Sequence, residues 1–227
     1  MQIGDKKVEI FRTLDGSDTL YLADIAEHYH STFGAVQESM HVFIRSGFDF
    51  CPRNDVSILE IGLGTGLNCF LTWNAARDSG RSVEYYALEK NPLPLTIIKK
   101  LNFGNTVTPF DSVVFWSLHE CQWECNVQIN NQFILHKIEA DLIKFNLSDL
   151  PEIDIIYFDA FSPEKQPELW NLSIFESLYS ALRSGGVLVT YCAKGYVRRN
   201  LQTAGFLVER IPGPPGKREM IRAVKPC

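Results

Sequence analysis

Three alternating glycines after a short apolar run constrain the fold of this chain more than any other feature. Residues 57–68 read Ser-Ile-Leu-Glu-Ile-Gly-Leu-Gly-Thr-Gly-Leu-Asn, so an apolar strand leads through Gly62, Gly64 and Gly66 into a helix. Glycines let a ligand approach the backbone, and free N–H groups at a helix start point to the same spot. The spacing differs from the dinucleotide fingerprint, and Glu60 favours a nearby cation over a pyrophosphate. The segment predicts a site for a nucleoside-bearing ligand, although a tight strand-to-helix connection has the same pattern.

Three acidic residues follow apolar runs that are typical of parallel strands. Glu89 ends the next run and is suited to accept hydrogen bonds from both hydroxyls of a ribose. Asp141 is suited either to meet an adenine amine or to cap a following helix. Asp159 ends a fourth run, where open α/β sheets bind ligands, and it is also suited to cap a helix. We therefore expect these acids at the edge of the sheet that carries the glycine turn.

Strand-like and helix-like segments alternate from Val56 onward, which is typical of a parallel sheet covered on both faces. Helices are expected at about 67–79, 93–102, 142–148, 168–183 and 194–204. Strands are expected at 56–61, 83–89, 133–139, 153–159, 186–191, 206–211 and 218–224. The last two strands are separated by six residues rich in Pro and Gly, so they should pair antiparallel. The prediction is an α/β, Rossmann-like, seven-stranded and mostly parallel sheet, which matches class I methyltransferases better than dinucleotide-binding proteins.

The remaining segments suggest an N-terminal extension and one insertion. Residues 7–22 are expected to form a short hairpin and residues 34–46 a helix. Residues 103–132 show no strong helical period and are interpreted as an insertion that includes a hairpin. We therefore divide the chain into an extension at 1–50, packed on the core, and a methyltransferase domain at 51–227.

Bulk properties favour a cytoplasmic protein without metal. The chain has 227 residues, no apolar run of membrane-spanning length and no apolar signal-peptide core at its start. Its six cysteines are scattered, which favours reduced thiols over a disulfide framework. Cys121 and Cys125 lie near His119, but no second pair completes a zinc site.

The net charge of −5 is unevenly distributed. From Arg183 to the end, nine Lys and Arg residues face two Glu residues, which gives +7, and the remainder of the chain carries −12. Such a distribution lets one face bind a polyanion while the protein as a whole stays acidic. Ordinary solvated charges spread over the surface are the alternative explanation.

Five ordered motifs across some 190 residues resemble the methyltransferase half of the MnmC family. They are Gly62 to Asn68, Glu89-Lys90, Asp159 to Trp170, Ala193 to Arg199 and Gly216 to Met220. The upstream segment Tyr29 to Phe43 also resembles the N-terminal region of this family. The resemblance implies an enzyme that uses S-adenosylmethionine to methylate 5-aminomethyl-2-thiouridine at the tRNA wobble position, giving 5-methylaminomethyl-2-thiouridine.

Many MnmC proteins also carry a flavin-dependent oxidase domain, for which this sequence offers no segment. We therefore expect the stand-alone methyltransferase form, which depends on other enzymes for its aminomethyl precursor. Ala160 departs from the glycine of some relatives without threatening the resemblance.

The resemblance also implies roles for individual residues. Asp159 is expected to be catalytic, first orienting the acceptor amine and second accepting its proton. The expected cofactor-binding residues are Glu60, Gly62, Gly64, Gly66, Asn68, Glu89, Lys90 and Asp141. The residues expected to meet the anticodon stem-loop are Phe161, Lys165, Trp170, Tyr191, Lys194, Arg198, Arg199, Lys217 and Arg218.

Two alternatives share the expected fold. An aminopropyltransferase of the spermidine synthase type also uses an adenosyl sulfonium and an acid that orients an amine. Such an enzyme would prefer an acidic pocket for its polyamine, whereas the Val-Arg-Arg and Gly-Lys-Arg-Glu motifs near the C-terminus favour a nucleic acid. A non-catalytic RNA-binding module would not need Glu89 and Asp159. A nicotinamide dehydrogenase is disfavoured by the glycine spacing.

Overall fold

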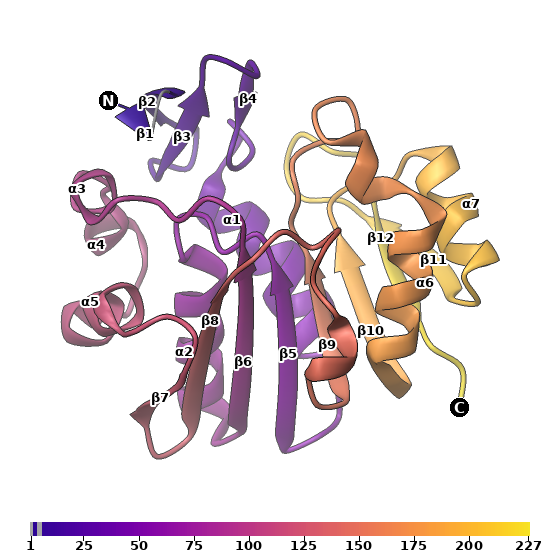
Figure 1. The fold of residues 1–227 in the computed structure, drawn as a ribbon. Helices are drawn as coiled ribbons and strands as arrows, with labels where there is room; N and C mark the ends of the chain where they lie inside the picture. Colours follow the sequence, from indigo (N-terminus) through magenta and orange to yellow (C-terminus); the bar gives the residue numbers. More distant parts are fainter. Residues whose placement is uncertain (1, 4–5) are drawn as a thin grey trace.

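The computed structural model describes residues 2–3 and 6–227 of the chain. Its centre is an eight-stranded sheet with the order β11-β12-β10-β9-β5-β6-β8-β7 (Figure 1). The strands of this sheet are β5 (Asp55–Ile61), β6 (Ser82–Glu89), β7 (Asn126–Asn130), β8 (Phe133–Glu139), β9 (Ile153–Phe158), β10 (Leu182–Thr190), β11 (Leu207–Pro212) and β12 (Glu219–Val224). All seven expected strands are present.

The sheet is parallel through its centre and antiparallel at both margins. β5 pairs in parallel with β6 and with β9, and these strands pair in parallel with β8 and β10 in turn. β12 runs antiparallel to both β10 and β11, as the short Pro- and Gly-rich connection predicts. The eighth strand is β7, which forms a hairpin with β8 through a turn at Asn131 and Gln132. The predicted count of seven was therefore one strand short, because β7 lies inside the expected insertion.

Helices cover both faces of the sheet. The helical elements are α1 (Ala35–Ser39), the π-helix η1 (Met40–Phe48), α2 (Leu67–Ser79), α3 (Leu95–Ile98), α4 (Phe103–Thr106), α5 (Ser112–Glu120), the 3-10 turns η2 (Leu147–Asp149) and η3 (Pro167–Trp170), α6 (Leu172–Ala181) and α7 (Gly195–Thr203). η1, α2 and α5 share one apolar core with one face of the sheet, and α6 and α7 share a second core with the other face. None of the helices in the described ranges is long and apolar enough to cross a membrane.

Two helix predictions were wrong, for local reasons. The helix expected at 142–148 is replaced by turns, in which Asp141 accepts from the Ile143 amide and Asn146 from the Ser148 amide. Such side-chain bonds compete with helical ones. Conversely, α5 forms inside the insertion, where β-branched and aromatic residues hid its period. Asp111 caps it by accepting from the Val114 amide at 3.0 Å.

Other boundaries also moved. Of the segment expected to be helical at 93–102, only α3 is a helix, and Pro94 is its N-cap residue. The helix expected at 168–183 is split into η3 and α6, which are separated by Asn171 in extended conformation.

The N-terminal residues form a second, antiparallel sheet at the carboxyl ends of the central strands (Figure 1). Its strands are β1 (Gln2–Ile3), β2 (Lys6–Arg12), β3 (Asp18–Leu22) and β4 (Glu27–His28). The expected hairpin is present as β2 and β3, and its inner face packs on α3 through Val8, Leu20, Leu22 and Ile97. This sheet lies on the same side of the molecule as the glycine turn.

Candidate active site

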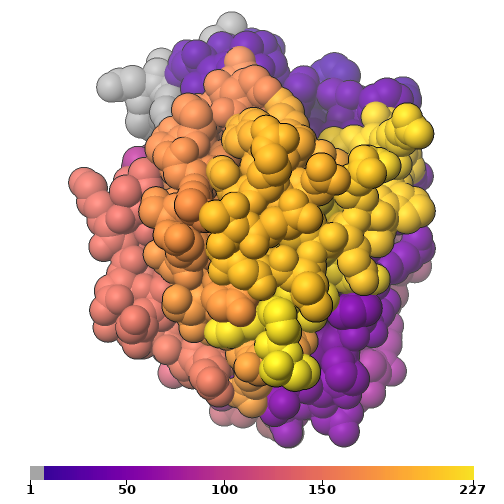
Figure 2. All heavy atoms as spheres, turned by 90° about the vertical axis from the view of Figure 1, so that its right-hand side faces the viewer, coloured from indigo at the N-terminus to yellow at the C-terminus, as the bar shows by residue number. Residues whose placement is uncertain are grey.

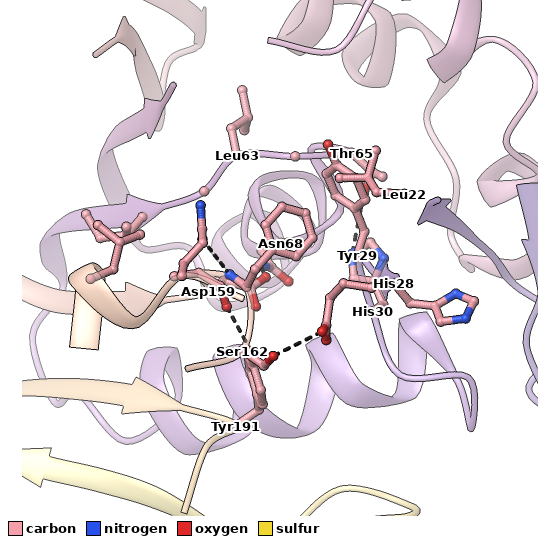
Figure 3. Close-up of a pocket in the computed structure, with 18 of the residues that line it drawn as sticks. Leu22, His28, Tyr29, His30, Leu63, Thr65, Asn68, Asp159, Ser162 and Tyr191 are labelled. Carbon is pink, nitrogen blue, oxygen red and sulfur yellow. Dashed lines mark hydrogen bonds between the residues drawn. The ribbon is translucent and has the colours of Figure 1, made fainter. Parts of the chain in front are cut away.

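A cavity of about 470 Å³ lies at the carboxyl edge of the central sheet. Its floor comes from the residues that follow the parallel strands β5, β6, β8 and β9. Its opposite wall comes from residues 26–33 of the N-terminal region. Figure 3 shows Asp159 and Asn68 on one side of this cavity and Tyr29 and His30 on the other.

The glycine turn is shaped by close neighbours at its two ends. Gly62 has φ +91°, and a Cβ on this residue would lie 2.8 Å from the backbone oxygen of Asp159. Gly66 has φ +71°, and a Cβ there would lie 2.6 Å from the His119 ring of α5. Gly62 and Gly64 line the cavity as predicted, whereas Gly66 does not, because its free side faces His119. Side chains larger than hydrogen are excluded by strain and by space.

Glu89 lies at the carboxyl end of β6, next to the glycine turn. Its carboxylate accepts hydrogen bonds from the Gly64 amide at 3.0 Å and from the Asn91 amide at 2.7 Å. A carboxylate has about four acceptor positions, so two of them stay free for a ligand. These bonds fix Glu89 at the wall of the cavity.

Lys90 and Asp141 form an ion pair across the ends of neighbouring strands. Lys90 Nζ lies 2.8 Å from Asp141 Oδ2, and both residues line the cavity. The hydrogen bond between the two side chains lowers the pKa of Asp141 and raises the pKa of Lys90. Asp141 therefore stays ionised, and its second oxygen serves the local turn through the Ile143 amide.

Asn68 joins two carboxyl groups beneath the cavity. Its Nδ2 donates to Asp159 Oδ2 at 2.8 Å and to Glu60 Oε1 at 2.9 Å. Burial raises the pKa of Asp159 to about 7, helped by Glu38 and opposed by Asn68 and Lys217. Burial raises the pKa of Glu60 well above its usual range, and Asp159 adds to this. Burial therefore favours the protonated form of Glu60, whereas Asp159 exchanges its proton near neutrality.

Glu60 differs from its predicted place. It is fully buried and does not line the cavity, so it contacts Asn68 rather than the cavity space. The reason is its position within β5, before the strand ends, where the alternation of side chains directs Glu60 to the face of the sheet that α2 and its Asn68 cover.

The cavity is rich in acids. Among the described residues that line it, six carry carboxyl groups and two carry ammonium groups. The acids are Glu27, Glu38, Glu89, Asp141, Asp159 and Glu168, and the bases are Lys90 and Lys217. Apolar side chains such as Leu63 and Leu142 separate them. Such a lining favours a cationic ligand.

The N-terminal wall was not assigned to the site by the sequence. Tyr29 faces Phe161 edge-on with ring centroids 5.1 Å apart. His30 is buried against Thr19 and Thr65, and burial lowers its pKa to about 4, so the imidazole is neutral. Ser162 donates to Glu27 at 3.0 Å. The motif from Tyr29 to Phe43 marked this region, but local sequence gives no sign that it faces Asp159.

The aromatic residues expected to meet nucleic acid have two different environments. Phe161 and Tyr191 line the cavity. The Tyr191 hydroxyl donates to the Ala160 carbonyl at 2.9 Å, and Lys217 Nζ lies 3.8 Å from the centre of its ring. Trp170 is fully buried and donates its Nε1–H to the Phe161 carbonyl at 2.9 Å. The prediction for Trp170 was wrong, because η3 turns this ring into the core to hold the 161–170 loop.

Four of the six predicted phosphate-contacting cations are not ion-paired within the part of the chain that the structure describes. They are Lys165, Arg198, Arg199 and Arg218. Lys194 is paired with Glu164, and Lys217 lies 2.6 Å from Glu38. Figure 2 shows that the last third of the chain, which carries all six of these residues, covers one continuous face of the molecule. Among the described residues, no three His, Cys, Asp or Glu side chains are grouped to hold a metal ion.

The order of the strands, the antiparallel C-terminal pair and the cavity over the glycine turn define a Rossmann-like methyltransferase. A family model described as S-adenosyl-L-methionine-dependent methyltransferase matches residues 114–226. This match spans 113 of the 227 residues, and the family's description agrees with the predicted methyl donor, S-adenosyl-L-methionine. The predicted fold class, enzyme class and cofactor are confirmed.

Among known proteins, the chain is similar to MnmC proteins. The crystal structure of MNMC2 from Aquifex aeolicus has a TM-score of 0.79 and 26% identity, and the match covers 99% of this chain and 73% of that one. The tRNA 5-methylaminomethyl-2-thiouridine biosynthesis bifunctional protein MnmC of Ralstonia nicotianae is 32% identical over 92% of this chain and 33% of its own length. The protein of the same name from Cupriavidus metallidurans is 30% identical over 91% of this chain and 32% of its own length. The predicted resemblance is confirmed, and the chain spans about a third of the length of these two relatives.

Proposed function

We propose that this methyltransferase transfers a methyl group to the primary amine of 5-aminomethyl-2-thiouridine at the tRNA wobble position. The observation that carries the proposal is Asp159, an acid with a pKa of about 7 beside the glycine turn, in a cavity dominated by carboxylates. The two MnmC relatives are named for biosynthesis of the methylated nucleoside. The comparisons do not favour the aminopropyltransferase alternative.

The residues of the floor fit the methyl donor. Gly62 and Gly64 leave the backbone of the turn open, and Glu89 keeps two acceptor positions for ribose hydroxyls. Asp141 with Lys90 lies at the next strand end, where adenine is expected, and Leu63 and Leu142 supply apolar surface. The bound donor supplies an electrophilic methyl group on a positively charged sulfur. The acidic lining stabilises that charge.

The acceptor amine needs to lose a proton before it can attack. An aliphatic amine has a pKa of about 10, so it is mostly protonated at neutral pH. Asp159 orients the amine by a hydrogen bond and, with its pKa of about 7, also accepts the proton that the amine releases. Asn68 holds the carboxylate from below and leaves Asp159 Oδ1 free for the amine.

The cations of the C-terminal face would meet the anticodon stem-loop. Lys165, Arg198, Arg199 and Arg218 are available for phosphates, whereas Lys194 and Lys217 first have to exchange their partners. Phe161 and Tyr191 line the cavity and are available to an extruded base. A tRNA substrate places the protein in the cytoplasm, where other enzymes would supply the aminomethyl precursor.

The test is a methylation assay with tRNA from cells that lack this activity. Protein and labelled methyl donor are added, and the nucleosides are separated by mass. The expected result is conversion of the aminomethyl wobble nucleoside into its methylaminomethyl form, with no label on tRNA that lacks the aminomethyl group. Label on another nucleoside, with the wobble amine unchanged, would contradict the proposal.

A further inference from the structure

Phe33 presents an exposed ring at the mouth of the cavity. Its side chain lines the cavity, yet 47% of the residue is accessible to solvent. It comes from the turn between β4 and α1, and it packs on Gly216 in the connection between β11 and β12. A Cβ on Gly216 would overlap three atoms of the Phe33 ring, so the glycine lets the ring lie against the backbone.

Hydrogen bonds on both sides hold the segment that carries Phe33. The Phe33 amide donates to Ser31 Oγ at 3.2 Å, and the Ser31 amide donates to Glu38 Oε2 at 2.6 Å. The Leu14 amide donates to the Thr32 carbonyl at 3.0 Å. The ring is therefore supported by fixed backbone before any ligand arrives, and this lowers the entropic cost of stacking on it.

The charge beside the ring fits nucleic acid. Arg218 follows Gly216 by two residues, is exposed and forms no ion pair within the described part of the chain. Lys217, between them, is turned inward to Glu38 and to the Tyr191 ring. An aromatic face with an unpaired guanidinium next to it is the usual combination for stacking one base and binding its phosphate.

We propose that Phe33 is a stacking platform for the unpaired nucleobase next to the nucleoside that enters the cavity, with Arg218 on the adjoining phosphate. The proposal rests on the proposed function, because it assumes that the cavity takes one nucleoside from a single-stranded loop. It assigns Phe33 to substrate affinity, since the ring lies at the rim and Asp159 at the floor.

The experiment measures binding of a synthetic anticodon stem-loop that carries 5-aminomethyl-2-thiouridine. Phe33→Ala should weaken binding about 5- to 100-fold, the range for loss of one stacked base, and Phe33→Trp should retain it. In methylation assays, Phe33→Ala should raise the Michaelis constant for the stem-loop by a similar factor, and Phe33→Trp should restore it. Phe50→Ala is the matched control, because Phe50 is 41% exposed but precedes β5 at the opposite edge of the sheet.

A second measurement uses the unaltered protein and stem-loops that are abasic on one side of the modified nucleoside. Two such stem-loops are needed, one abasic on the 5′ side and one on the 3′ side. One of them should bind to the unaltered protein as weakly as the complete stem-loop binds to Phe33→Ala. Binding of that abasic stem-loop to Phe33→Ala should be little weaker still. Additive losses, unchanged binding by Phe33→Ala, or equal binding by Phe33→Leu and Phe33→Trp would overturn the platform. Failure of the wild-type protein to methylate the stem-loop, with Phe33-dependent binding intact, would instead overturn the proposed function alone.

Discussion

The floor and the rim of the cavity are built in different ways. The floor consists of short turns that directly follow the parallel strands, and it carries Glu89, Asp141 and Asp159. The rim joins segments that are far apart in the chain, as in the contact of Lys217 with Glu38 across 179 residues. Proximity in the floor follows from strand order alone, whereas proximity in the rim requires the whole molecule to be folded.

The two regions also differ in electrostatics. Burial raises the pKa of Asp159 in the floor and of Glu60 behind it, so the chemistry of this region is obtained at a cost in stability. In the rim, contacts between partly exposed groups stabilise the fold weakly and adjust to a bound ligand. We therefore expect floor substitutions to affect turnover or folding strongly and rim substitutions to act mainly on substrate affinity.

The largest effect is expected at Asp159. Asp159→Ala should lower the turnover number about 100-fold or more, because it removes both orientation and proton acceptance. The wild-type rate should fall as the pH drops through about 7, where the carboxylate becomes protonated. Asp159→Asn keeps the size of the side chain and should lose this limb of the pH profile. Calorimetry should show methyl-donor binding within a few-fold of wild type, and unimpaired turnover by either variant would exclude the role.

The next largest effect is expected on stability, when Gly62 and Gly64 of the turn are each replaced by Ala. Gly62→Ala should cost about 2–4 kcal/mol of unfolding free energy, since its Cβ would meet the Asp159 backbone oxygen at 2.8 Å. Gly64→Ala should cost about 1–2 kcal/mol, because it meets the Tyr29 side chain at 3.0 Å and that ring can move. Denaturant titration compares the two variants. Equal costs would remove the distinction between a rigid floor and an adjustable rim.

A smaller effect separates two substitutions of Glu60. Glu60→Gln should retain activity within a few-fold, because an amide oxygen can accept from Asn68 as the Glu60 carboxyl oxygen does. Glu60→Ala should cost about 1–3 kcal/mol of stability and reduce the turnover number, because Asn68 loses its second partner. Turnover and melting temperature distinguish the variants. A specific rise in the Michaelis constant for the methyl donor in Glu60→Gln would restore the original prediction of direct cofactor contact.

The smallest effect is expected at the Lys217–Glu38 contact of the rim. Lys217→Met should cost about 1 kcal/mol of stability, since the Lys217 side chain is 31% exposed and the Glu38 side chain 8%. The Michaelis constant for tRNA should rise several-fold with little change in the turnover number. A double-mutant cycle with Glu38→Gln measures the coupling. A large loss of turnover would show that this contact belongs functionally to the floor.

Several elements could be predicted from sequence because their signals are local. The apolar runs gave all seven predicted strands, and α2 matches its expected range. The acids at the ends of β6 and of the strand that leads to Asp159 were expected at the ligand edge for the same reason. The helix at α5 was missed, because its residues favour strands and its formation depends on packing of Phe115 and Leu118.

The sequence by itself determined the parallel sheet, the glycine turn and the edge where its acids meet, because strand period, turn residues and chain order are local properties. Only the tertiary structure decided that Glu60 lies beneath Asn68, that Trp170 is core and that residues 26–33 close the cavity. Those outcomes depend on the direction in which a side chain leaves its strand and on contacts between distant segments. Such contacts form only when burial of apolar surface has fixed the whole fold.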